Sequence, residues 1–247
     1  MRHRRNQPAM THNLPQPEIV ALDGVEIALE SWSWPFAPER RDEIDEHFAS
    51  LQRERSGVWN GRVLLMHRYA IAHRVLRGAC FETDYASLCA WRDWEFPDPA
   101  VYNFFTATAL QSADGAYLVG EMAPHTAAAG LRYFPCGTPE PADMDGRGRF
   151  DLPGNLRREL LEETGIAIEE LDCEPGWSFV RDRCFVGLLK RVTAREDADA
   201  LRSRIMRHLA SETRPEFCDI RIIRGPDDLD ARMPAFVVAF LQAMWRQ

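Results

Sequence analysis

Residues 158–166 read RELLEETGI, a stretch with three glutamates that ends in a glycine and an isoleucine. Asn155 is suited to cap the start of a helix, and Gly165 suits the left-handed residue that ends one. A Pro/Gly/Asp-rich segment at 135–154 precedes it and has the composition of a loop. The sequence therefore predicts a helix at 155–164 that is entered through a long loop.

The three glutamates of this stretch share one face of the predicted helix. At 3.6 residues per turn, Glu159, Glu162 and Glu163 fall within an arc of roughly 100°. Like charges at this spacing destabilise a helix by roughly a few tenths of a kcal/mol each, and a hard cation between them reverses the sign. Three convergent carboxylates suit Mg²⁺ or Mn²⁺, which prefer oxygen ligands. The alternative is a solvated acidic face on which Arg158 pairs with Glu162, and it leaves two glutamates unexplained.

The stretch RELLEETGI is similar to the core of the Nudix box, and the preceding YFPCGTPEP, at 133–141, resembles the strand and glycine-rich loop that enter it. The resemblance implies an α/β/α sandwich with a mixed sheet, and metal-dependent hydrolysis of a nucleoside diphosphate linked to another moiety. It implies Glu162 and Glu163 as metal ligands, with Glu163 needed for catalysis. Glu159 is implied as a ligand or as the base for the attacking water, and Arg158 as the residue that orients the glutamates.

The chain departs from the family pattern in the loop before the helix. The pattern places a glutamate six residues after a glycine, whereas here Gly137 is followed at that spacing by Asp143. The loop from there to Arg158 is about seven residues longer than the pattern in this register. Gly137 is expected to let the backbone approach metal and phosphate, because it has no Cβ. With its glycines and aspartates, the segment 143–154 is predicted to be exposed and mobile.

A narrower resemblance points to the UDP-sugar pyrophosphatases within this family. The element Gly-Thr-Pro-Glu-Pro at 137–141, the lengthened loop and an additional N-terminal region are similar to features of that subgroup. The resemblance implies cleavage of UDP-glucose or UDP-galactose to UMP and sugar 1-phosphate, with Gly137 and Glu140 near the substrate. The alternatives are ADP-ribose, a dinucleotide or coenzyme A as substrate, or a non-catalytic Nudix module that senses a ligand.

Two further substrate-binding candidates are Arg181 and Arg183, which flank Asp182 just before a predicted strand. Guanidinium groups suit bidentate contact with phosphate oxygens. The alternative interpretation is a solvated turn.

The chain is predicted to consist of a disordered tail at 1–17, an N-terminal α+β region at 18–98 and a Nudix hydrolase domain at 99–247. In the N-terminal region, strands are expected at 25–34 and 62–66 and helices at 38–55 and 84–94. In the main domain, strands are expected at 102–110, 116–122, 131–134, 184–192 and 217–223, with further helices at 199–212 and 233–245.

Composition limits the partners. A net charge of −8 argues against a nucleic-acid backbone, while it is compatible with a small phosphorylated substrate handled by metal ions. No apolar run has the roughly 18 residues that would cross a bilayer, so no membrane partner is expected. The six cysteines show no metal-ligand spacing and are interpreted as buried side chains in a reducing compartment, with a cytoplasmic location. The oligomeric state is left open.

Overall fold

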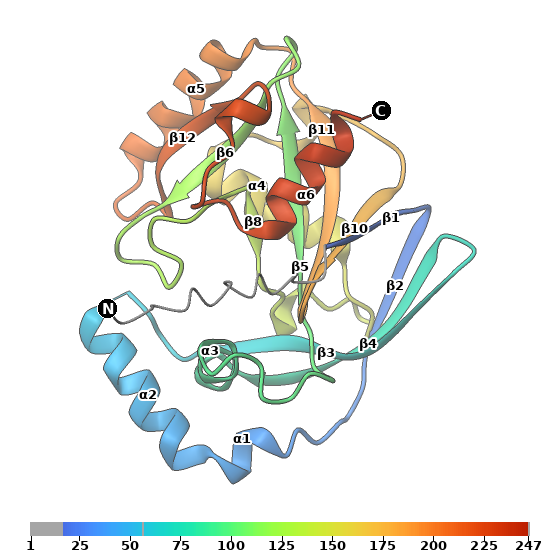
Figure 1. The fold of residues 1–247 in the computed structure, drawn as a ribbon, viewed down its shortest axis with the longest axis vertical. Helices are drawn as coiled ribbons and strands as arrows, with labels where there is room; N and C mark the ends of the chain where they lie inside the picture. Colours follow the sequence, from blue (N-terminus) through green and yellow to red (C-terminus); the bar gives the residue numbers. More distant parts are fainter. Residues whose placement is uncertain (1–16, 56, 247) are drawn as a thin grey trace, which may run out of the picture.

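The computed structural model describes residues 17–55 and 57–246, so the predicted tail at 1–17 lies almost entirely outside the described residues. A large mixed sheet forms the centre, in the order β1-β10-β11-β5-β6-β12 (Figure 1). Its strands are β1 (Glu18–Leu22), β10 (Trp177–Asp182), β11 (Phe185–Thr193), β5 (Asn103–Gln111), β6 (Tyr117–Met122) and β12 (Phe217–Ile223). The short strands β7 (Arg132–Tyr133), β8 (Cys136–Gly137) and β9 (Asp172–Cys173) pair onto β6, β5 and β11. The pair β11–β5 is parallel and the other pairs are antiparallel.

Helices cover both faces of this sheet. α6 (Ala235–Met244) packs on one face, where Phe236 and Phe240 meet Phe105 of β5 in one buried cluster. α4 (Leu152–Thr164) and α5 (Ala198–Ser211) pack on the other face, where Leu160 and Ile205 are buried with β-strand side chains. The alternation of side chains along each strand supplies both faces with apolar surface. The α/β/α sandwich with a mixed sheet is therefore confirmed as the architecture.

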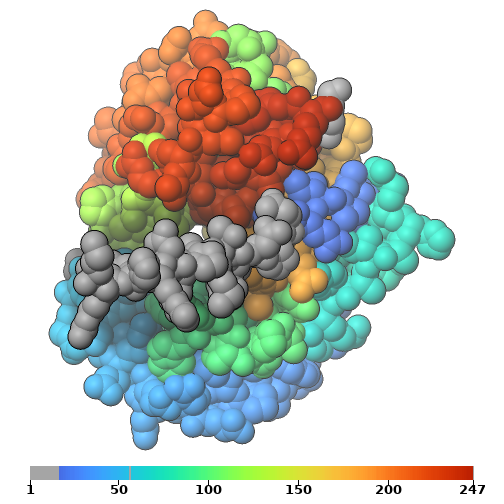
Figure 2. Space-filling view, viewed as in Figure 1, coloured from blue at the N-terminus to red at the C-terminus, as the bar shows by residue number. Residues whose placement is uncertain are grey.

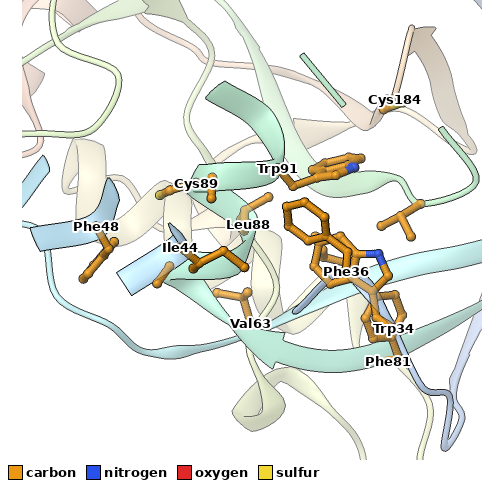
Figure 3. Packing of buried hydrophobic residues seen from close by; sticks show 14 of the residues in the cluster. Trp34, Phe36, Ile44, Phe48, Val63, Phe81, Leu88, Cys89, Trp91 and Cys184 are labelled. Atoms are coloured by element: carbon orange, nitrogen blue, oxygen red, sulfur yellow. The ribbon is translucent and has the colours of Figure 1, made fainter. Parts of the chain in front are cut away.

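The N-terminal part contributes a second, three-stranded sheet in the order β2-β4-β3. Its strands are β2 (Gly24–Leu29), β3 (Arg62–Ala72) and β4 (Val75–Asp84), and its helices are α1 (Phe36–Glu39), α2 (Arg41–Glu54) and α3 (Tyr85–Asp93). A cluster rich in aromatic side chains holds helices and sheet together, with Trp34, Phe81 and Trp91 at its centre (Figure 3). The predicted mixture of helices and strands in this region is thus present.

The two parts are closely joined. β1 belongs to the large sheet, where it pairs with β10, and the next strand, β2, belongs to the small one. The Leu64 amide donates to the Pro139 carbonyl at 2.8 Å, which connects β3 to the glycine-containing loop. Figure 2 shows the N-terminal part, coloured blue to green, against the lower side of the orange and red C-terminal part. The division at residue 98 stays a prediction.

The segment 143–154 is partly exposed, as its composition predicts, but it is more regular and more firmly attached than a free loop. Its ends are structured, because Asp143 closes the 3-10 turn η1 (Pro141–Asp143) and α4 begins at Leu152. Between them, the Leu29 amide donates to the Gly148 carbonyl and the Phe150 amide to the Ile27 carbonyl, both at 2.9 Å. Phe150 is buried between the two sheets. The extra residues therefore lie along the edge of β2, which covers that edge.

Predicted and observed elements differ in two further ways. The sequence interpretation missed β4, whose VLRGACFETD lacks clean alternation, and also β1 and β10. The structure also contains the short 3-10 turns η2 (Ile168–Glu170) and η3 (Pro226–Asp228). Among the cysteines, which are all free, Cys173 and Cys218 are exposed, so the expectation that all six are buried is wrong. In the described part of the chain, no helix is both long and apolar enough to span a membrane.

Candidate functional site

The glutamate helix α4 begins three residues earlier than predicted. Asp151 is its N-cap and accepts a hydrogen bond from the Gly154 amide at 3.1 Å. Leu152 and Pro153 form the first turn, where a missing proline amide costs no hydrogen bond. Asn155, expected to be the cap, is instead a buried residue inside the helix. Gly165 ends the helix with a φ of 68°, as predicted.

Around the first turn of α4, polar groups satisfy one another. The buried Asp143 carboxylate accepts from the Asn155 side-chain amide at 3.0 Å and from the Glu140 backbone amide at 2.9 Å. It also accepts two hydrogen bonds from Arg158, at 2.9 and 3.1 Å. A buried carboxylate with this many donors is compensated for leaving water. Asp143 therefore fixes the lengthened loop to the helix.

Arg158 links this network to the box glutamates. Its Nη1 lies 2.8 Å from Glu159 and 3.4 Å from Glu162. The Glu162 side chain is 60% exposed, whereas that of Glu159 is 13% exposed. The arginine thus draws Glu162 toward solvent, and the three carboxylates do not converge as the helical spacing alone predicts. Arg158 lies where it can orient the glutamates.

Glu163 lies deepest among the three. The residue is 5% exposed, and its Oε2 accepts a hydrogen bond from the Cys136 amide at 2.8 Å. Its other oxygen, Oε1, is buried without a hydrogen-bond partner among the described residues. Leaving a carboxylate oxygen unpaired in the interior is costly, so such an atom calls for an explanation.

The electrostatics of this acidic group favour protonation. Burial raises the pKa of Glu159 to about 7, and the charges of Glu162 and Glu216 add to the rise. The ion pair with Arg158 works in the opposite direction but is outweighed by burial. Burial, followed by the charges of Glu159 and Glu216, raises the pKa of Glu163 well above its usual range. Shifts of this kind, with named causes, are typical of functional sites.

Glu216 belongs to this group and was missed by the sequence interpretation. It lies between α5 and β12, and its carbonyl accepts from the Ala123 amide at 2.8 Å. Burial by neighbouring atoms and the charge of Glu162 raise its pKa, although its side chain reaches solvent. Nothing in the local sequence marks this residue, because it meets the box glutamates only through the tertiary fold.

The glycine-containing loop lies directly over the acidic helix. β8 pairs with β5, which brings Gly137 opposite Thr106. A Cβ built on Gly137 would collide with the Glu159 carboxylate, so a larger residue here would displace that carboxylate. Glu140, predicted near the substrate, is exposed on the same loop. The loop and α4 therefore form one surface of backbone and carboxylate.

The donor chemistry of this surface fits a hard divalent cation. Within 17–55 and 57–246, no three His, Cys, Asp or Glu side chains are arranged as a metal-binding group. The fit rests instead on the unpaired Oε1 of Glu163 and on the neighbouring carboxylate of Glu159, which lies against the backbone of Gly137. Carboxylate oxygens are the ligands that Mg²⁺ and Mn²⁺ prefer.

Arg181 and Arg183 lie elsewhere. The Arg181 guanidinium is 5.4 Å from the Tyr102 ring, and that of Arg183 is 4.7 Å from the Phe96 ring. Arg183 also donates to the Glu95 carbonyl at 3.4 Å. These contacts connect β10 and the turn after it to residues 95–102, and none of them involves α4. Their predicted role in substrate binding stays a prediction.

No protein-family model matches the chain, and no curated protein matches it. Similar solved structures include the Nudix hydrolase RenU from M. smegmatis, with 14% identity, a TM-score of 0.38 and coverage of 59% of this chain and 87% of that one. The MutT protein from Methanosarcina mazei Go1 has 15% identity, a TM-score of 0.39 and coverage of 59% and 94%. A C. elegans Ap4A hydrolase has 14% identity, a TM-score of 0.35 and coverage of 58% and 98%. With identities and TM-scores this low, these likenesses carry no argument about function.

Proposed function

We propose that the chain is a Nudix hydrolase that cleaves a nucleoside diphosphate linked to another moiety. The observation that carries the proposal is the buried, unpaired Oε1 of Glu163 on the helix that bears the box sequence. Beside it lie Glu159 and Glu216, whose pKa values are raised, and the glycine-containing loop passes directly above. A buried carboxylate oxygen without a partner, among other acids with raised pKa values, suits phosphate chemistry with metal ions and has no evident structural use.

In this proposal, Glu159, Glu162 and Glu163 hold Mg²⁺ or Mn²⁺, and Glu216 is a further candidate ligand. When bound, the metal would supply positive charge beside the diphosphate and would lower the pKa of a coordinated water molecule. Glu162 reaches the site by turning its exposed side chain away from Arg158, a change between solvated rotamers. Because Arg158 also pairs with Asp143, its guanidinium still has an acidic partner after Glu162 turns away.

The side chains around the site have distinct roles. Glu159 acts either as a ligand of the metal or as the base that accepts a proton from the attacking water. Arg158 orients Glu159 through the 2.8 Å ion pair. Gly137 lets the loop backbone approach the phosphates, and Glu140, on the exposed side of that loop, is placed to meet the rest of the substrate.

For the substrate, we propose a UDP-sugar, UDP-glucose or UDP-galactose, cleaved to UMP and sugar 1-phosphate. The Gly-Thr-Pro-Glu-Pro element supports this, because its glycine lies over Glu159 and its Pro139 carbonyl is bound by Leu64 of β3. The lengthened loop supports it as well, since it packs on the N-terminal sheet and places that region beside the site. A domain junction is a usual place for specificity. A cytoplasmic location stays a prediction.

The test is a panel of UDP-glucose, UDP-galactose, ADP-ribose, a dinucleoside polyphosphate and coenzyme A, each with Mg²⁺, with Mn²⁺ and with EDTA. Phosphorus NMR identifies the products. We expect turnover only with added metal, and the highest kcat/KM for a UDP-sugar. A far higher kcat/KM for another compound would contradict the proposed UDP-sugar substrate but would support the proposed hydrolase activity. No turnover of any compound with either metal would overturn the hydrolase itself. Because attack at either phosphorus gives the same products, ¹⁸O-labelled water is needed to identify the reacting phosphorus.

A further inference from the structure

Trp59 is an exposed indole on a turn that is otherwise well fixed. The residue is 71% exposed, the highest value among the large hydrophobic residues that the structure describes. Its six-membered ring lies over the next glycine, so that a Cβ built on Gly61 would approach Cη2 and Cζ2 to 3.0 Å. Burying such a side chain contributes roughly 2 kcal/mol to stability, which this position forgoes.

The turn that carries Trp59 is hydrogen-bonded to the first turn of α3. The Gly61 carbonyl accepts from the Tyr85 amide at 2.9 Å, and the Asn60 side chain accepts from the Ala86 amide at 2.9 Å. On the other side, the Val58 carbonyl accepts from a side chain of α2 at 3.1 Å. The backbone on both sides of the indole is therefore held in place. A ligand that stacks on it has little chain entropy to remove.

The same turn touches the loops that border the acidic site. The Arg55 guanidinium donates to the Ala127 carbonyl in the loop after β6. Gly57 lies against the Arg214 guanidinium and the His125 carbonyl, the latter 3.1 Å from a Cβ built on Gly57. Figure 1 shows this segment, between α2 and β3, beside the loop that follows β6. The turn therefore lies at the rim of the junction between the two parts of the molecule.

From this rim, a short path leads to the glutamates. Arg214 lies two residues before Glu216, whose carbonyl is bonded to the loop after β6. His208, near the end of α5 and six residues before Arg214, contacts the Glu162 carbonyl at 3.0 Å. The segment that carries Trp59 is thus connected, through Arg214 and α5, to the C-terminal end of α4.

We propose that Trp59 is the stacking platform for the base of the substrate, which places the nucleoside end of the nucleoside diphosphate on the N-terminal part of the chain. This inference rests on the proposed function. The indole offers an apolar face that every base can stack on, and the fixed turn presents it to solvent. The diphosphate then extends past Arg214 toward Glu159 and Glu163, with the guanidinium beside its negative charge.

The test compares the binding of UMP and of ribose 5-phosphate, which lacks the base, by calorimetry with Mg²⁺ present. Neither compound has a diphosphate bond, so binding is measured without turnover. We expect wild-type protein to prefer UMP by about tenfold or more, Trp59→Ala to lose that preference and Trp59→Phe to keep most of it. Leu29→Ala, which shortens another exposed apolar side chain on β2, should bind as wild type does. Circular dichroism checks that each variant is folded.

A wild-type protein without preference for UMP, or a Trp59→Ala variant that keeps the preference, would overturn this inference. In steady-state assays, Trp59→Ala should raise KM by about tenfold with little change in kcat, because stacking contributes equally to ground state and transition state. A fall in kcat with KM unchanged would contradict a stacking role. Metal-dependent turnover, together with equal binding of UMP and ribose 5-phosphate, would contradict the role of Trp59 but not the proposed hydrolysis. Tighter binding of UMP than of ribose 5-phosphate, without turnover of any compound, would contradict the proposed hydrolysis but not the role of Trp59.

Discussion

Asp143 and Glu163 are both buried carboxylates beside α4, and the structure treats them in opposite ways. Asp143 is 8% exposed and accepts hydrogen bonds from a backbone amide, an asparagine and an arginine. Glu163 is 5% exposed, accepts from one backbone amide and keeps one oxygen unpaired. The charged groups that contribute most to raising its pKa are two other acids, Glu159 and Glu216.

The difference separates a stabilising carboxylate from a functional one. A buried charge with several donors is compensated and fixes the groups around it. A buried charge that faces like charges destabilises the fold and is expected where binding of a ligand repays the cost. The first turn of α4 thus anchors the helix, while its later turns carry the chemistry. Each prediction below tests one side of this contrast.

The largest effect is expected for Glu163→Gln. The amide keeps the shape but removes the charge that would bind metal, so kcat should fall by at least about 100-fold. In EDTA, the same variant should unfold at a higher temperature than wild type, because a buried charge among like charges is gone. Enzyme assays and thermal melts measure the two effects. Wild-type turnover in the variant, or a melting temperature below that of the wild type, would contradict a functional role for Glu163.

Phe150→Ala should produce the largest loss of stability. Phe150 is 5% exposed and packs edge-on against Phe104 at 5.3 Å between ring centroids. Removing a buried phenyl ring costs about 3 kcal/mol or more, which chemical denaturation would measure. Hydrogen exchange at Phe150 and Leu29 should be slow in wild type and faster in the variant. Fast exchange in wild type would restore the mobile loop that composition predicts.

Asp143→Ala should destabilise the protein by a smaller amount, about 2 kcal/mol, because its partner Arg158 is half-exposed and can turn to solvent. Thermal melts should show a fall of roughly 4–8 °C. The expected loss has the opposite sign from the gain for Glu163→Gln in EDTA. A change in melting temperature of the same sign for both variants would contradict the distinction between Asp143 and Glu163.

The smallest effect concerns pH. The folded-state pKa values of Glu159 and Glu163 are raised, to about 7 for Glu159, from an ordinary value of 4.5. Between these values the folded protein holds protons that the unfolded chain has released, so the free energy of unfolding falls as pH rises. In EDTA, the melting temperature should fall by roughly a few °C from about pH 5 to about pH 8 through this pair. Glu163→Gln should show a shallower fall, and an unchanged slope would refute the assigned cause.

Local periodicity predicts the acidic helix, whereas the α/β/α sandwich is implied by the resemblance of RELLEETGI to the Nudix box. The sequence misplaces the helix start, since Asn155 is an equally good cap in isolation and only the fold turns it toward Thr106 and Asp143. Composition misjudges the segment 143–154 for a similar reason, because its glycines and aspartates do not reveal that β2 offers an edge. Glu216 joins the site from another part of the chain, so no local pattern could mark it.

The central claim is that Glu163, with its unpaired carboxylate oxygen, and its neighbouring glutamates on α4 bind a divalent cation. Calorimetric titration with Mn²⁺, on wild type, Glu163→Gln and Glu169→Gln, tests it without reference to any substrate. Glu169 is an exposed acid beyond the end of α4 that pairs with Arg157, so its loss controls for general charge. We expect Mn²⁺ binding in wild type and Glu169→Gln, and at least about tenfold weaker binding in Glu163→Gln. Equal Mn²⁺ affinity in all three proteins, or none in wild type, would contradict the claim.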